Sequence, residues 1–147
     1  MFEHERRSRA YYERRARWYD WTNRAAAFVR GASPKRERLK AVRRLNLRPG
    51  DRVLEVSVGT GTNIPLIAER TGGGGRVIGL DISRGMLGVC QDKLRRTHVP
   101  AALIEGEAGH LPFADGSFDA VFHRGGIAEF GDRAPAIAEM YRVARPG

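Results

Sequence analysis

An apolar run that breaks into a glycine-rich turn constrains this chain more than any other feature. Residues 52–58 are rich in β-branched and aliphatic side chains, a composition typical of a parallel strand buried on both faces. Gly59 and Gly61 have no Cβ, so they allow a sharp turn and a close approach of the backbone to a ligand. A helix that begins near Thr62 would point its free N–H groups at that ligand. The plain alternative is an ordinary connection in which the glycines only form the turn.

The rest of the chain repeats strand and helix patterns around this stretch. The strands that we expect span residues 52–58, 76–81, 101–105 and 118–123. The helices that we expect span residues 5–29, 34–45, 63–70, a segment capped by Ser83, and residues 133–144. Alternating strands and helices predict an α/β fold of the Rossmann-like, doubly wound type, with a parallel sheet in the strand order 3-2-1-4. We divide the chain into a basic aromatic helical arm, residues 1–48, and a core, residues 49–147.

The net charge of the chain, +9, is concentrated in the arm. Residues 1–48 carry 15 Lys and Arg against 5 Asp and Glu, whereas residues 49–147 carry 11 against 12. Tyr11 and Trp18 lie seven residues apart among these arginines and share one face of a helix. Such a helix suits an anionic membrane surface, nucleic acid or a protein partner, or it folds over a site in its own core. It is equally consistent with a solvated helix that simply packs on the core.

Composition disfavours several classes of protein. No apolar run reaches the roughly 20 residues that span a bilayer, and the charged N-terminus differs from a secretory signal. We therefore expect a cytoplasmic protein without a transmembrane segment. Cys90 is the one cysteine, so no internal disulfide forms, and its place in a helical pattern indicates a buried structural thiol. No spacing of His, Cys and Asp indicates a metal site.

The pattern of acidic and small residues around the turn indicates which class of ligand the turn would bind. A nicotinamide or flavin fingerprint, G-x-G-x-x-G, would place its third glycine where Ile64 stands. Glu55 in the first strand and Asp81 at the end of the second instead resemble the first motif of the class I S-adenosylmethionine-dependent methyltransferases, usually E/D-x-G-x-G-x-G. This chain departs from that motif at Ser57, where the family's first glycine is expected.

Two further segments carry the same resemblance. Residues 106–119 resemble the family's G-D-A-x-x-L-P-F-x-D-x-S-F-D segment, with Glu107 where Asp is commoner. Residues 16–23 resemble the tyrosine–aspartate segment of the quinone- and lipid-methylating members, the type called methyltransferase domain 11. The resemblance implies that Glu107 or the adjacent backbone of Ala108 faces the adenine amino group. It also implies that Tyr19 helps to close the site and contacts the cofactor.

The expected cofactor is S-adenosyl-L-methionine. In doubly wound folds, an acidic residue such as Asp81 at the tip of the second strand accepts hydrogen bonds from both ribose hydroxyls. The glycines would admit the amino-acid end of the cofactor, and Glu55 would orient the loop or the cofactor's ammonium group. The full set of expected cofactor-binding residues is Tyr19, Glu55, Ser57, Gly59, Thr60, Gly61, Asn63, Asp81, Ile82, Met86, Glu107 and Ala108.

The end of the fourth strand supplies the one candidate catalytic residue. His123 is our candidate general base, because ligands in open α/β sheets lie off the carboxyl ends of strands and imidazole titrates near neutrality. The alternative is a structural or pocket-lining histidine. The resemblance implies methyl transfer to a small-molecule or lipid-like acceptor. A nucleic-acid-associated protein is disfavoured, because the chain lacks an N-P-P-Y-type motif for base methylation.

The end of the sequence is the main departure from the family. In most members, R-V-x-x-P-G is followed by three more strands, and we expect their absence to leave the fourth strand at an open edge. We expect a second copy in a homodimer, or the aromatic arm, to cover this edge. The same absence suggests an alternative function, a non-catalytic cofactor-binding module or half of a split or dimeric methyltransferase.

Overall fold

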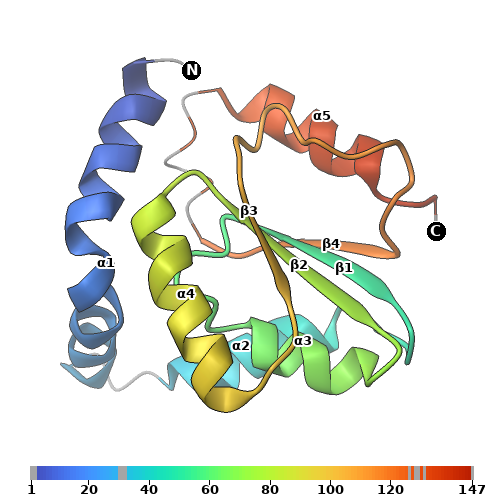
Figure 1. Ribbon diagram of the computed structural model, residues 1–147, viewed down its shortest axis with the longest axis horizontal. Helices are drawn as coiled ribbons and strands as arrows, with labels where there is room; N and C mark the ends of the chain where they lie inside the picture. The colour runs from blue at the N-terminus through green and yellow to red at the C-terminus, as the bar shows by residue number, and fades with distance from the viewer. Residues whose placement is uncertain (1–2, 30–32, 126, 128–129, 131, 147) are drawn as a thin grey trace.

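The chain folds around a four-stranded parallel sheet (Figure 1). The computed structural model describes residues 3–29, 33–125, 127, 130 and 132–146. Its elements are α1 (Glu3–Val29), α2 (Pro34–Arg43), β1 (Arg52–Val56), α3 (Ile64–Thr71), β2 (Arg76–Asp81), α4 (Arg84–Thr97), β3 (Ala102–Glu105), β4 (Ala120–His123) and α5 (Arg133–Val143). The strands lie in the order β3-β2-β1-β4 and every neighbouring pair is parallel. The predicted fold class and strand order are therefore confirmed.

The central strand β1 supplies the middle of two apolar cores, one on each face of the sheet. Val53 packs with residues of α2, α3 and α4 on one face, and Leu54 and Val56 pack with Phe118 and α5 on the other. Each of these side chains is buried, which contributes about 1.5–3 kcal/mol per residue relative to exposure. The carboxyl end of β1 is thereby held rigidly. The division of the chain at residue 48 stays a prediction, and Val42 of α2 packs within the first core.

Strand and helix ends follow from local backbone chemistry. β1 ends at Val56, two residues before the predicted end, because Ser57 adopts a φ of 56° that interrupts the extended backbone. The predicted cap of α4 is confirmed, since Ser83 Oγ accepts a hydrogen bond from Met86 N at 3.2 Å. Ser33 stands at the N-cap of α2 and Pro34 begins that helix, although the serine side chain makes no capping bond.

The helix α1 packs along α4, through a face that the sequence did not indicate (Figure 1). Ala16 is buried against the core, and Glu13 Oε2 accepts a hydrogen bond from Gly85 N at 2.9 Å at the start of α4. Tyr11 and Trp18, the stripe seen in the sequence, are 47% and 66% exposed. α1 packs through this side because its contact with α4 contains small residues, Ala16 and Gly85, which let the two helices approach closely. In the described part of the arm, α1 lies on α4 and α2 lies on α3, so neither helix covers the β4 edge.

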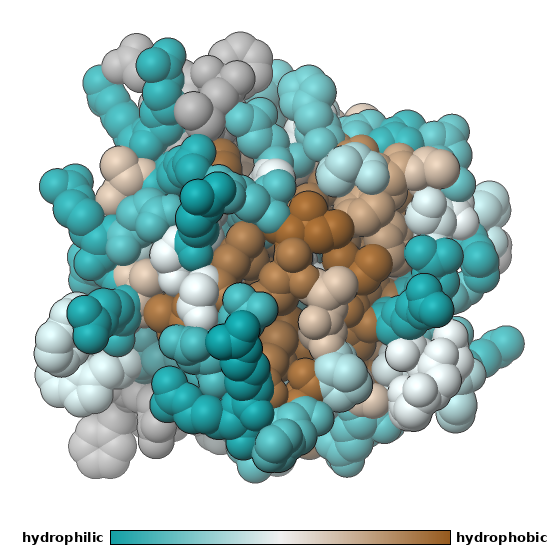
Figure 2. Space-filling model, in the orientation of Figure 1, coloured by the Kyte–Doolittle hydropathy of each residue, from teal (hydrophilic) through white to brown (hydrophobic). Residues whose placement is uncertain are grey.

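The face of the molecule drawn in Figure 2 has apolar side chains gathered over β3 and the strands behind it, with hydrophilic side chains around them. A groove between α4 and β3 is lined by the apolar residues Leu87, Leu94, Val99, Ala101 and Leu103. Within the part of the chain that the structure describes, no helix combines the length and the apolar character needed to cross a membrane.

Candidate functional site

A pocket lies at the carboxyl ends of the parallel strands, between α1 on one side and the start of α5 on the other. This is the place where open α/β sheets bind ligands. Eight of the predicted site residues line it: Tyr19, Ser57, Gly59, Asp81, Ile82, Met86, Glu107 and Ala108. Five do not: Glu55, Thr60, Gly61, Asn63 and His123. The predicted set therefore divides into residues at the pocket and residues behind it.

Asp81 holds the turn after β1 in place from inside the pocket. Its Oδ2 accepts a hydrogen bond from Gly59 N at 2.8 Å, and its Oδ1 accepts one from Ser83 N at 2.9 Å. The side chain is 8% exposed, and burial raises its pKa from the ordinary value. A carboxylate offers about four lone-pair sites, so Asp81 can accept further bonds from a pair of ligand hydroxyls.

The two glycines of the turn have different surroundings. Gly59 has a φ of 55°, and a Cβ added to it would meet no atom within 4 Å. Gly61 has a φ of 71°, and a Cβ there would lie 2.2 Å from Cys90 Sγ of α4. Gly59 therefore keeps space open at the pocket, whereas Gly61 lets the loop pack against the core. Ser57, where the family motif has glycine, also has a positive φ.

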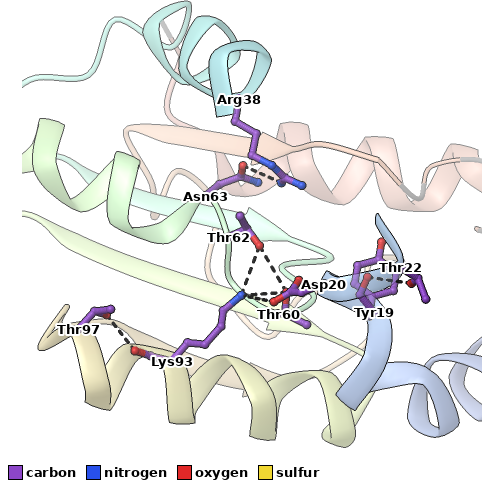
Figure 3. Close-up of polar contacts among 9 residues, drawn as sticks. All are labelled: Tyr19, Asp20, Thr22, Arg38, Thr60, Thr62, Asn63, Lys93 and Thr97. Carbon is purple, nitrogen blue, oxygen red and sulfur yellow. Dashed lines mark hydrogen bonds and ion pairs between the residues drawn. The ribbon is translucent and has the colours of Figure 1, made fainter. Parts of the chain in front are cut away.

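Glu55 and Asn63 support the loop from below the pocket. Asn63 Nδ2 donates to Glu55 Oε1 at 2.6 Å. Arg38 Nη1 of α2 donates to Asn63 Oδ1 at 3.2 Å, the contact drawn in Figure 3. Glu55 is 2% exposed, and this burial raises its pKa to about 7. Its Oε2 is buried without a hydrogen-bond partner among the described residues. Arg38 was missed from the sequence, because the contact joins residues 25 positions apart.

A second network joins the arm to the loop from outside (Figure 3). Asp20 Oδ1 accepts a hydrogen bond from Thr60 Oγ1 at 2.6 Å, and Lys93 Nζ of α4 donates to Asp20 Oδ2 at 2.7 Å. Lys93 also donates to Thr60 Oγ1 at 3.2 Å. The two residues of the tyrosine–aspartate segment therefore have different roles. Asp20 bonds α1 to the loop and to α4, and the neighbouring Tyr19 lines the pocket.

The segment that follows Glu107 and Ala108 is hydrogen-bonded to α5. Arg142 donates to the carbonyl oxygens of Phe113 and Leu111 at 2.8 and 3.1 Å. Glu139 Oε2 accepts from Leu111 N at 2.7 Å, and its bonds with Arg142 lower the pKa of Glu139 to about 2. These two residues were missed from the sequence, although the R-V-x-x-P-G pattern contains the arginine.

His123 lies beside the pocket, behind residues that line it. Its Nδ1 is 3.0 Å from the carbonyl oxygen of Val56, which can only accept, so Nδ1 carries the proton and Nε2 is left as an acceptor. Nε2 is buried and has no hydrogen-bond partner in the described ranges. The ring packs 5.1 Å from that of Phe130, which lines the pocket together with Arg124 and Gly125. The general-base role stays a prediction.

The described residues contain no group of three or more His, Cys, Asp or Glu side chains that could hold a metal ion. The pocket instead offers a carboxylate for hydroxyl groups, an open glycine and apolar walls. A parallel 3-2-1-4 sheet with this glycine turn and strand-end acid defines a Rossmann-like nucleoside-binding core.

Comparisons with known proteins agree with that class. Residues 53–147 match the family model described as a methyltransferase domain. The chain is 35% identical over 144 residues to the demethylmenaquinone methyltransferase of Anoxybacillus flavithermus, which covers 97% of this chain and 60% of that protein. It is 41% identical over 103 residues to the ubiquinone/menaquinone biosynthesis C-methyltransferase UbiE of Xanthomonas campestris pv. campestris, covering 69% and 41%. The chain therefore belongs to the methyltransferase domain family, among its class I S-adenosylmethionine-dependent members.

A solved structure extends the likeness to the fold. Phospholethanolamine N-methyltransferase 2 of Haemonchus contortus, in complex with phosphomonomethylethanolamine and S-adenosylhomocysteine, matches with a TM-score of 0.69 and 28% identity. The match covers 76% of this chain and 26% of that one. The cofactor of the family is S-adenosyl-L-methionine, and the residues present fit it, because Asp81 retains acceptor capacity beside the open space at Gly59. The chain spans about 60% or less of the length of the quinone methyltransferases named above.

Proposed function

We propose that this chain transfers the methyl group of S-adenosyl-L-methionine to a small, quinone-like acceptor with lipid character. The observation that carries the proposal is the Asp81 carboxylate, held by Gly59 N–H and Ser83 N–H at the pocket and still able to accept from two ribose hydroxyls. The acceptor class is supported by the relatives, which are named as quinone methyltransferases.

Methyl transfer requires the protein mainly to bind the cofactor and the acceptor and to orient them. When bound, the cofactor supplies a methyl group already activated by its sulfonium sulfur. Asp81 would accept bonds from the ribose hydroxyls, and Glu107 with the backbone of Ala108 would bind the adenine edge. Tyr19 and Phe130 would exclude water from the methyl group, since both line the pocket.

The acceptor must lose a proton when a ring carbon gains a methyl group. We keep His123 as the candidate base for this proton, because the bond from Nδ1 to the Val56 oxygen leaves Nε2 as the acceptor of the neutral ring. Nε2 is buried behind the pocket lining, so the acceptor would reach it only if Phe130 moves aside. His123→Asn is then expected to lower turnover about 100-fold while affinity for S-adenosylhomocysteine is unchanged. Turnover would be measured with a water-soluble naphthoquinol that has one unsubstituted ring carbon, and phosphoethanolamine would serve as the mismatched acceptor.

Cofactor binding is the first test, by calorimetric titration with S-adenosylhomocysteine. We expect micromolar binding, and a loss of about 100-fold or more in Asp81→Ala, because two hydrogen bonds to a charged acceptor disappear. Asp92→Ala, an exposed acid on α4, is the matched control and should bind normally. A folded sample that does not bind, or an Asp81→Ala variant that binds like the parent chain, would refute the proposal.

We also keep the prediction that two copies associate through β4. β4 is an edge strand of the described sheet and pairs with β1 alone among the named strands. Light scattering should then give the molar mass of a dimer. A monomeric mass at high protein concentration would contradict it.

A further inference from the structure

The face of α1 that points away from the core combines aromatic and cationic side chains. It consists of Tyr11, Arg14, Arg15, Trp18 and Trp21, and we call it the outer face. Their spacing of three and four residues places them on one side of the helix. Tyr11 is 47%, Trp18 66% and Trp21 68% exposed, so three aromatic side chains of this face meet solvent. None of them belongs to either apolar core.

Among the described residues, the two arginines of the outer face have no acidic partner. Arg15 Nη1 donates to the Tyr11 hydroxyl at 2.8 Å and lies over its ring at 5.0 Å. Arg14 Nε donates to the carbonyl oxygen of Ala10 in the same helix, at 3.4 Å. In the described residues neither forms an ion pair with a carboxylate, whereas Arg9 on the opposite side pairs with Glu105 at 2.6 Å. The outer face is therefore complementary to an anionic surface.

We propose that the outer face docks the protein on an anionic lipid bilayer. Tryptophan and tyrosine prefer the headgroup level of a membrane, where one part of the ring is wet and another is apolar. Arginines that flank them bind anionic headgroups. The face runs from residue 11 to residue 21, about 15 Å along one uninterrupted helix, so its side chains can meet a planar surface together.

An adjacent side of the same helix, roughly a quarter of a turn from the outer face, gives this docking a functional role, which rests on the proposed function. Ser8, Tyr12 and Tyr19 of α1 line the cofactor pocket. A helix with its side chains is about 10–12 Å thick, so docking would hold the pocket within about one helix diameter of the bilayer. A lipid-like acceptor dissolves in that bilayer, and α1 would form the wall between the acceptor's source and the site.

The chain carries its own probe for this proposal. Trp18 and Trp21 are its two tryptophans, so all tryptophan emission reports on the outer face. The full chain would be titrated with vesicles of phosphatidylcholine alone and with vesicles that contain phosphatidylglycerol. We expect a blue shift with the anionic vesicles, quenching by brominated acyl chains, and co-flotation of the protein. High salt should weaken the binding.

Paired variants separate the outer face from general charge. Arg14→Gln with Arg15→Gln should weaken the partition to anionic vesicles roughly 30-fold, at about fivefold for each charge. Arg95→Gln with Arg96→Gln, two exposed arginines on α4, is the matched control and should change it less than threefold. Trp18→Ala with Trp21→Ala should reduce co-flotation further, and Tyr141→Ala, an aromatic residue 80% exposed on α5, should not.

The outcomes distinguish this proposal from the proposed function. If the chain binds S-adenosylhomocysteine but shows no blue shift and no flotation, the docking proposal is wrong and the function stands. If it docks on vesicles but does not bind S-adenosylhomocysteine, the function fails alone. Equal losses in the outer-face and control arginine variants, or a preference for single-stranded RNA over anionic vesicles at high salt, would also overturn the docking proposal.

Discussion

The glycine loop, residues 57–63, has two sides that look alike in the sequence and differ in the structure. On the pocket side, Gly59 is open and its N–H is held by Asp81. On the core side, Gly61 packs against Cys90 and Asn63 bonds to Glu55. One motif therefore contains residues that can meet a ligand and residues that shape the loop. Substitutions on the pocket side should mainly weaken ligand binding, and substitutions on the core side should mainly lower stability.

The two glycines give the largest expected contrast. Gly61→Ala should lower the free energy of unfolding by about 2–4 kcal/mol, because the new Cβ overlaps Cys90 Sγ and the backbone has a positive φ. Gly59→Ala should cost only about 1–2 kcal/mol of backbone strain, yet weaken S-adenosylhomocysteine binding by filling open space. Urea unfolding and calorimetry measure the two effects.

Cys90→Ala supplies the control for the overlap. In the Gly61→Ala background it removes the sulfur that the new methyl group would meet, so the double variant should regain about 1–2 kcal/mol over additivity. Additive losses would mean that the strain of Gly61 comes from its backbone conformation alone. Equal effects of the two glycine variants on stability and binding would remove the distinction between the two sides.

The pH dependence of stability tests the role of Glu55 on the core side of the loop. In the unfolded chain Glu55 ionises near its ordinary pKa of 4.5, whereas burial raises its pKa to about 7 in the folded protein. Between these values the folded state holds the extra proton, so raising the pH lowers the free energy of unfolding, and the loss is complete above about pH 7.

The Glu55→Gln variant isolates that contribution. Its stability minus that of the parent chain should rise by roughly 2–3 kcal/mol from pH 4.5 to pH 7 and then level off. Urea unfolding across this range measures it. A constant difference would show that Glu55 is ionised in the folded protein throughout.

Local patterns predicted the fold well. Buried β-branched runs, Ser83 as a cap and the turn glycines are signals contained within a few residues, and the strand order follows from right-handed crossovers. The ends of elements were less accurate, because one backbone angle at Ser57 stops β1 and no local pattern reports that angle. The packing face of α1 was missed because the aromatic stripe is more conspicuous than Ala16 and Glu13.

Part of the expected site lies at the pocket, where the residues belong to a motif. Asp81 and Gly59 both line the pocket, and the bond from Gly59 N to Asp81 Oδ2 is a contact that the motif did not predict. Arg38, Lys93 and Arg142 were not predicted, because each has a partner in another segment, 25 or more positions away, that no short pattern links to it. Charged side chains on helices are common, so only the folded structure distinguishes these three from solvated ones.

The Asp20 network tests whether the loop is also held from outside. Asp20→Asn should lower stability by only about 1 kcal/mol, because the pair with Lys93 is partly exposed. It should weaken S-adenosylhomocysteine binding about threefold to tenfold, since Tyr19 loses its anchor beside Thr60. Hydrogen exchange should show faster opening of α1.

An exposed pair within one helix is the control for Asp20. Glu37→Gln breaks the ion pair with Lys40 on α2, at a comparable separation of the charged atoms, and touches neither the loop nor the pocket. Its effect on binding should be nil. Matching effects of both variants would mean that Asp20 acts through general electrostatics and that the arm does not position the loop.

Substitution of Ser57 gives the smallest expected change in stability, and it tests directly whether a side chain on the pocket side contacts the ligand. With a φ of 56°, Ser57→Gly should raise the free energy of unfolding by about 0.5–1 kcal/mol, because the strain that it relieves exceeds the entropy that glycine adds. Asn46→Gly is the control, since asparagine tolerates its φ of 49° and should gain little. If Ser57→Gly stabilises the chain and leaves S-adenosylhomocysteine binding within about twofold, the serine is a strained substitute for the family's glycine. If binding falls instead, the hydroxyl of Ser57 contacts the ligand, and the pocket side of the loop binds through this side chain as well as through the open glycine.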